Sequence, residues 1–185
     1  TADSWQSEPN DPEKKYTESC HYSDFHLGKF INAAKKQTWY SNTLFVIVAD
    51  HSHNSIKQWP GENAHRSHIP LLITGGALKP EWRGKTWDKI VSQLDIPSTL
   101  LHQMKIPCDR YVWSRNIFNP TTPSSAFYVF FGGAGYINEN GFASQHQGSK
   151  IISHEVKDSS QLNMMYNKAM SFQQLVYEEV KMLAR

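Results

Sequence analysis

The sequence has few cysteines, no long apolar run and no signal peptide. Only two cysteines, Cys20 and Cys108, occur among its 185 residues. Their spacing fits no metal-binding motif; we expect buried thiols, with a disulfide as the alternative, and so small a number does not fix the redox compartment. No apolar run approaches the roughly 18 residues of a membrane-spanning helix. The first residues have neither the basic start nor the apolar stretch of a signal peptide.

An excess of one charge is also missing. The formal net charge is only +2, and the basic residues are scattered among acidic ones. The basic pairs Lys14-Lys15 and Lys35-Lys36 are short enough to be solvated faces, so the sequence does not predict a nucleic-acid partner. A hydrophobic content of 39% is enough for one ordinary core. Because the chain does not begin with methionine, we expect it to be a piece of a longer protein.

The first half alternates between helical and strand patterns. Residues 1–21 are polar and loop-like, and Tyr22–Trp39 has apolar residues at helical spacing. Thr43–Ala49 is almost wholly apolar, which is typical of a central parallel strand with helices on both sides. Ile69–Thr74 predicts a second strand that ends at two glycines, and Val91–Met104 a helix. This order predicts an α/β layered domain. The residues expected to point inward from the last helix are Leu94, Ile96, Leu100 and Leu101.

The second half predicts hairpins and a final helix. Phe127–Phe131 has the composition of a short strand, Gly132–Gly135 that of a turn, and Asn138–Gly141 that of a second turn. Lys150–Val156 predicts a further strand and Gln161–Leu183 an amphipathic helix. We therefore expect one domain in three sections: a lead-in (1–21), an α/β core (22–106), and β hairpins with a terminal helix (107–185).

The residues with the most chemical potential follow the first predicted strand. Asp50 and His51 end that strand, where an α/β sheet usually binds ligands, and can give one oxygen and one nitrogen ligand to a divalent metal. Three more histidines follow, His53, His65 and His68. The alternative is that Asp50 caps a turn and His51 is a polar surface residue.

Four segments stand out by their order and spacing: Tyr22–Phe30 (a helix), Trp39–His51 (a strand and the loop after it), His68–Ile73 (a returning strand) and Gln93–Leu101 (a helix with the pattern Gln-x-Asp-Ile-x-x-Thr-Leu-Leu). Together they resemble the sulfatase family of the alkaline phosphatase superfamily, and within it the lipoteichoic-acid-synthase-like phosphoglycerol transferases. The resemblance covers roughly residues 22 to 106 and is less sharp from Phe127 onward.

This resemblance implies a C-terminal part of the family's layered fold. It also implies that Asp50 and His51 are ligands of a divalent metal, either manganese, magnesium, calcium or zinc. His65 or His68 is similar to the later histidine that binds a second metal or contacts the substrate anion. The spacing from His51 favours His65, whereas the position before the Ile-Pro strand favours His68. His53 is the weakest candidate.

The sequence departs from the family pattern in two ways. Ser52 stands where most relatives have glycine. The family's nucleophile and first acidic ligand precede this region, and we cannot place either in the chain. Cys20 lacks the Cys-x-Pro-x-Arg context of sulfatases, and Thr17 and Ser19 lack a preceding strand. We therefore expect the chain to hold half a metal site, with metal bound weakly at most, and not to turn over substrate unaided.

Two functions remain open from the sequence. The first is the partial catalytic domain of a metal-dependent enzyme that acts on small-molecule, lipid-linked or glycan sulfate or phosphate esters, as a sulfuric ester hydrolase or a phosphoglycerol transferase. It would need the N-terminal part of the same protein as its partner. The second is a non-catalytic module that binds an anionic glycan, a lipid head group or a protein. The transferase resemblance implies an extracytoplasmic domain of a membrane-anchored parent.

Overall fold

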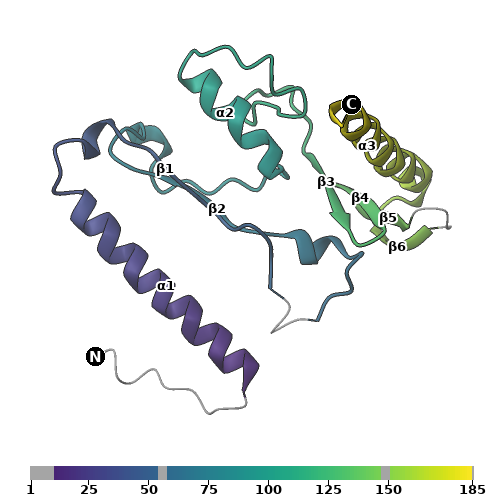
Figure 1. Ribbon diagram of the computed structural model, residues 1–185, viewed down its shortest axis with the longest axis horizontal. Coiled ribbons are helices and arrows are strands. Elements are labelled where there is room, and N and C mark those ends of the chain that lie inside the picture. Colours follow the sequence, from purple (N-terminus) through teal and green to yellow (C-terminus); the bar gives the residue numbers. More distant parts are fainter. Residues whose placement is uncertain (1–10, 54–57, 147–150, 185) are drawn as a thin grey trace. The chain divides into compact units, whose positions relative to one another are not determined.

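A computed structural model describes residues 11–53, 58–146 and 151–184. The chain folds into two compact units, which are described separately (Figure 1). The first unit comprises the chain up to Trp59 together with His68–Thr86, and the second comprises Pro60–Ser67 together with the chain from Trp87 onward. The short segment Pro60–Ser67 thus interrupts the first unit and packs within the second. The chain rejoins the first unit at His68.

The first unit begins with α1 (Pro12–Ala34), which starts well before the predicted Tyr22 and ends before Trp39. The Asp11 side chain accepts a hydrogen bond from the Lys14 amide at 3.1 Å, which caps the helix. Pro12 then occupies the first turn, where its missing N–H costs nothing. The predicted loop is therefore wrong for residues 12–21, because the Asp-Pro pair starts a helix; residues 1–10 lie outside the described chain.

The two strands of this unit, β1 (Phe45–Val48) and β2 (Leu71–Thr74), are antiparallel. The prediction of a central parallel strand is wrong here, since β2 is the one neighbour of β1 in the part of the chain that the structure describes. An apolar strand indicates burial and says nothing about the direction of its neighbour. Two-stranded sheets are marginal alone, and Leu72 on β2 is 53% exposed.

The start of β1 is held against α1 and against the end of β2. The Phe45 ring meets the Phe30 ring of α1 edge to face, with centroids 5.7 Å apart. Gly75, directly after β2, has a φ of +126°, and a Cβ there would overlap the Thr43 carbonyl oxygen. Glycine is therefore required at the end of β2, as the sequence predicts from its pair of glycines.

The second unit contains a four-stranded antiparallel sheet in the order β3-β4-β5-β6, covered on one face by α3 (Leu162–Leu183). The strands are β3 (Ser125–Phe130), β4 (Gly133–Asn138), β5 (Gly141–His146) and β6 (Ile151–Val156). The hairpin layer and the terminal helix are thus confirmed. The predicted turn at Gly132–Gly135 is wrong, because Gly133 to Gly135 belong to β4. Gly135 is needed there, since a Cβ would overlap the Tyr128 ring.

The core between the sheet and α3 consists of Tyr136, Ala143, Met165, Tyr166 and Ala169. A second cluster, formed by Ala64, Tyr128 and Phe142, includes a residue of the Pro60–Ser67 segment. The Tyr128 hydroxyl donates to the Glu62 carbonyl at 3.0 Å, and burial raises the pKa of Tyr128 well above its ordinary value. This small segment is therefore an integral part of the second unit.

The predicted helix at Val91–Met104 is a 3₁₀ turn (Gln93–Asp95) followed by α2 (Ile96–Gln103). Its buried face is polar, which corrects the predicted apolar one. Asp95, Ser98 and Thr99 are at most 2% exposed, whereas Leu94 is 46% exposed. The remaining residues expected inward are half-buried: Ile96, Leu100 and Leu101.

Both cysteines are free thiols. Cys20 is exposed on α1, so the expectation of a buried thiol is wrong there, and Cys108 is half-buried. Among the described residues, no helix has both the length and the apolar character needed to cross a bilayer.

Candidate functional site

Asp50 and His51 directly follow β1, and their side chains face one another. His51 Nε2 lies 3.4 Å from Asp50 Oδ2, and both side chains are mostly exposed, at 78% and 86%. The His51 amide also donates to Asp50 Oδ1 at 2.8 Å. One carboxylate oxygen of Asp50 thus caps the local turn, as the alternative interpretation of the sequence expected. The other oxygen is directed to the His51 imidazole.

The His51 ring is oriented by its own backbone. Nδ1 lies 2.8 Å from the Ser52 carbonyl oxygen, which can only accept, so Nδ1 carries the proton and donates it. In the neutral ring, this arrangement leaves the lone pair on Nε2, the nitrogen beside Asp50. A main-chain carbonyl that fixes the second ring nitrogen is the usual support of a metal-binding histidine.

His68 lies beyond the same end of the β1–β2 ladder as Asp50 and His51. The last paired residues are Val48 and Leu71, and the pairing is antiparallel. The residues that follow β1 and those that precede β2 therefore leave the ladder at one end. Asp50 and His51 lie on the first of these segments and His68, which is exposed, lies on the second.

His65 belongs to the second unit, where it faces the sheet. Its Nε2 lies 3.9 Å from Glu155 Oε2 of β6, and its ring meets the Phe142 ring of β5 edge to face at 6.3 Å. The Asn63 side chain accepts from the His65 amide at 2.9 Å, which fixes the turn that carries it. Glu155, Phe142 and Asn63 are all residues of the unit to which His65 belongs.

His53, the weakest sequence candidate, is stacked on Tyr16 of α1. The ring centroids are 4.1 Å apart and the planes differ by 13°. Sequence reasoning missed this contact because residues 1–21 were expected to form a loop. The helix signal that could have revealed it was the Asp-Pro pair at the start of α1.

The donor set fits part of a metal centre. An aspartate oxygen and a histidine nitrogen are common ligands of zinc and manganese. Two atoms bound to one ion at about 2.0–2.2 Å lie roughly 3–3.5 Å apart, which is the spacing of Asp50 Oδ2 and His51 Nε2. Across residues 11–53, 58–146 and 151–184, however, no three His, Cys, Asp or Glu residues gather as a complete site.

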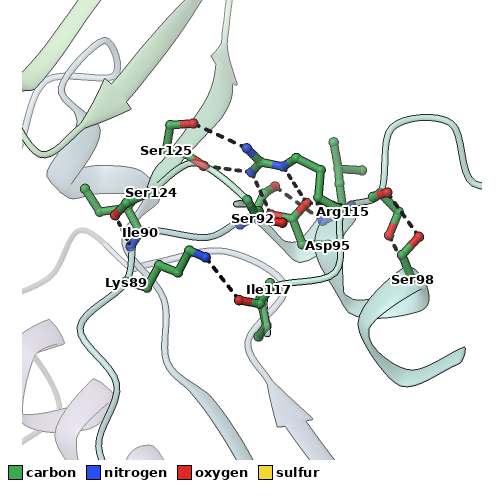
Figure 2. A network of polar contacts seen from close by, with 12 residues as sticks. Lys89, Ile90, Ser92, Asp95, Ser98, Arg115, Ile117, Ser124 and Ser125 are labelled. Carbon is green, nitrogen blue, oxygen red and sulfur yellow. Dashed lines mark hydrogen bonds and ion pairs between the residues drawn. The ribbon is translucent and has the colours of Figure 1, made fainter. Parts of the chain in front are cut away.

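A second polar network, around Asp95 and Arg115, has a structural role that the sequence did not reveal (Figure 2). Arg115 donates from Nε to Asp95 Oδ1 at 2.9 Å and from Nη2 to Oδ2 at 2.7 Å. Asp95 is only 1% exposed and also accepts from the Ser92 and Arg115 amides. Nη2 reaches the Ser125 carbonyl at 2.7 Å, so the pair connects the start of α2 to β3.

Thr99 and Ser98 extend this network along α2. The Thr99 hydroxyl donates to the Asp95 carbonyl at 2.6 Å and accepts from the Ile117 amide at 3.1 Å. Ser98 donates two hydrogen bonds to Ser114, from its amide to the hydroxyl at 2.9 Å and from its hydroxyl to the carbonyl at 3.0 Å. The Gln-x-Asp-Ile-x-x-Thr pattern therefore holds α2 against the irregular segment before β3.

These features agree with comparisons to known proteins. The sequence profile of the family described as Sulfatase matches residues 3–106, more than half of the chain. The chain belongs to the sulfatase family. Lipoteichoic acid synthase 2 of Bacillus subtilis (strain 168) is 27% identical over 112 residues, which are 54% of this chain and 17% of that protein. The sulfatase-family chain thus spans a small part of the curated relative that it matches.

The fold has a solved counterpart in a protein of the alkaline phosphatase superfamily from Vibrio parahaemolyticus. The two structures superpose with a TM-score of 0.72 at 21% identity, over 95% of this chain and 45% of that one. The predicted fold class, an α/β part of the alkaline-phosphatase/sulfatase fold with antiparallel hairpins and a terminal helix, is thereby confirmed. The sulfatase family is a family of enzymes, so the loop with Asp50 and His51 belongs to an enzymatic scaffold.

Proposed function

We propose that this chain is the partial catalytic domain of a metal-dependent enzyme that acts on sulfate or phosphate esters. Asp50 and His51 supply two ligands of its divalent metal. The observation that carries the proposal is the convergence of Asp50 Oδ2 and His51 Nε2 at 3.4 Å, with the opposite ring nitrogen tied to the Ser52 carbonyl. When bound, a divalent ion would neutralise the ester oxyanion and activate a hydroxyl nucleophile.

His68 is the better of the two later histidines for this site. It leaves the β1–β2 ladder at the same end as Asp50 and His51, and it belongs to the same unit. His65 instead faces Glu155 and Phe142 of the other unit. We assign His68 as a further ligand or as the contact to the substrate anion, in preference to the spacing argument that favoured His65.

The preceding part of the same protein is the proposed partner of this chain. It would supply the nucleophile and the first acidic ligand, and the half-exposed apolar residues of β1 and β2 are suited to being covered by it. The similarity to a lipoteichoic acid synthase supports a phosphoglycerol transferase over a sulfuric ester hydrolase, with a lipid-linked or glycan phosphate ester as substrate. The same similarity supports an extracytoplasmic domain of a membrane-anchored parent.

The test is made in the parent protein, with the Asp50→Ala and His51→Ala variants assayed on phosphate and sulfate esters at increasing manganese. We expect activity to fall by at least about a hundredfold, because an ion that loses a ligand binds weakly and activates its nucleophile poorly. His21→Ala, a histidine on the exposed surface of α1, is the control. A parent that stays fully active without Asp50 would remove the metal-site assignment. An inactive wild-type parent would favour the non-catalytic binding module.

A further inference from the structure

The loop that carries Asp50 and His51 is held to α1 by an aromatic stack. His53 lies parallel to Tyr16, with ring centroids 4.1 Å apart and planes 13° from parallel. Within the loop, contacts join His51 to Asp50 and His51 to Ser52. The stack connects the loop to α1.

Tyr16 makes two contacts, one through the face of its ring and one through its hydroxyl. Along the exposed first turns of α1 its side chain is half-buried, unlike those of Lys14, Lys15 and Thr17. Its hydroxyl is hydrogen-bonded to Cys20 one helical turn later, and this bond is the main reason that the pKa of Tyr16 is raised. The stack on His53 uses the face of the ring and does not involve this hydroxyl.

The position of His53 couples this anchor to the metal loop. His53 follows His51 by two residues, and the residue between them provides the carbonyl that orients the His51 ring. A shift of the backbone at His53 would therefore move the Ser52 carbonyl and, with it, the direction of His51 Nε2. Groups that orient a ligand in this manner affect metal affinity without touching the ion.

We propose that Tyr16 is a positioning residue for the Asp50–His51 metal loop and that His53 is its anchor rather than a metal ligand. This inference rests on the proposed metal site. It gives α1 a role at the site that goes beyond covering β1, since the first turns of the helix hold the loop in its binding geometry.

The experiment follows manganese binding to the 185-residue chain by paramagnetic broadening of the histidine ring resonances in NMR spectra. The variants are Tyr16→Ala, Tyr16→Phe and Asp50→Ala. Tyr22→Ala is the matched control, because it removes the same side chain from the same helix, where the Tyr22 ring packs on His26 of α1. Circular dichroism of each variant checks that the helices remain formed.

We expect Tyr16→Ala to require about tenfold more manganese to broaden the His51 resonance, the lower end of the effect of removing ligand-orienting groups. Tyr16→Phe keeps the stacking face and should stay within about twofold of wild type, as should Tyr22→Ala. Equal binding by Tyr16→Ala and wild type would overturn the role of Tyr16. An equal loss in Tyr16→Phe would show that the hydroxyl rather than the ring face holds the loop and would overturn the stack as the anchor. An equal loss in Tyr22→Ala would implicate general helix stability and would overturn the role of Tyr16.

The proposed metal site fails in a different way. If manganese does not broaden the His51 resonance of the wild-type chain, or broadens it equally in Asp50→Ala, the metal site itself is refuted, and the positioning role falls with it. Broadening of His51 that depends on Asp50 but not on Tyr16 refutes the positioning role alone.

Discussion

Arg115 binds the buried carboxylate of Asp95 with two parallel hydrogen bonds, of 2.9 and 2.7 Å. This fork-to-fork geometry is the strongest form of an ion pair, and here it joins α2 to β3. The two partners are unequally buried, because Asp95 is 1% exposed whereas the Arg115 side chain is 32% exposed. Loss of the arginine leaves a buried charge without its partner, whereas Asp95→Asn removes the charge, keeps one oxygen as an acceptor, and leaves an arginine that water can reach.

We therefore expect Arg115→Ala to lower the free energy of unfolding by about 3–5 kcal/mol, the usual cost of leaving a buried charge unpaired. Asp95→Asn should cost less, and Arg115→Lys should fall between wild type and Arg115→Ala because lysine cannot bind both oxygens. Urea unfolding of the chain measures all three, with exposed Arg110→Ala as the control. A larger loss for Asp95→Asn than for Arg115→Ala would contradict this ordering.

The isolated chain should not hydrolyse generic phosphate or sulfate esters with added manganese, magnesium, calcium or zinc. An ion with two protein ligands keeps several waters and binds loosely, so it does little to lower the pKa of a bound water. The measurement is release of phosphate or sulfate over hours, with the parent protein as the positive control. Metal-dependent turnover by the chain alone would mean that it contains a nucleophile that we have not identified.

Gly135→Ala should destabilise the second unit by about 1–3 kcal/mol, the usual cost of forcing an extra methyl group into a packed core. A Cβ at this position overlaps the Tyr128 ring, which is fixed by its hydrogen bond to Glu62. Gly61→Ala is a matched control in the same unit, because a Cβ there meets no atom within 4 Å. Equal midpoints in urea for the two variants would show that the Tyr128 ring can move aside.

Asp158 should make the start of α3 sensitive to acid. Hydrogen bonds from the Ser160 hydroxyl, the Gln161 side chain and the Ser160 amide hold the pKa of Asp158 below its usual value of 3.8. A carboxyl group whose pKa is depressed on folding stabilises the fold above its unfolded pKa, and this contribution is lost as the pH falls through the lower, folded value.

The stability difference between wild type and Asp158→Asn should therefore be largest near about pH 6 and should shrink below about pH 4. Urea midpoints across this range give the difference. Glu178→Gln, on the exposed side of α3, controls for the general effect of removing a negative charge. A difference that stays constant with pH would show that the hydrogen bonds of Asp158 do not depend on its charge.

The sequence was most informative where local chemistry decides structure. The turn at Asn138–Gly141, the glycine pair after β2 and the amphipathic pattern of α3 each specify their elements, and the structure has all three. The adjacency of Asp50 and His51 likewise guarantees that their side chains start close together. What it could not give was the 3.4 Å approach, which depends on the carbonyl of Ser52.

The sequence did not predict the features that depend on residues far apart in the chain. The polar inner face of α2 is explained by Arg115, which lies 20 residues from Asp95 in a stretch without any periodic pattern. The Ser92–Asp95 capping box was a usable signal for the start of that helix, though not for its buried pair. Likewise, the direction of β2 relative to β1 and the partners of His65 are set by the packing of each unit.

The segment Pro60–Ser67 also has a consequence for biosynthesis. Glu62 precedes its partner Tyr128 by 66 residues, so Ala64 and the turn around it leave the ribosome long before the sheet that they cover exists. The strands that flank this segment, β1 and β2, can pair early only if the chain between them remains a loop without its final contacts. The connection between β1 and β2 therefore reaches its final packing only once the strands of the second unit have been synthesised.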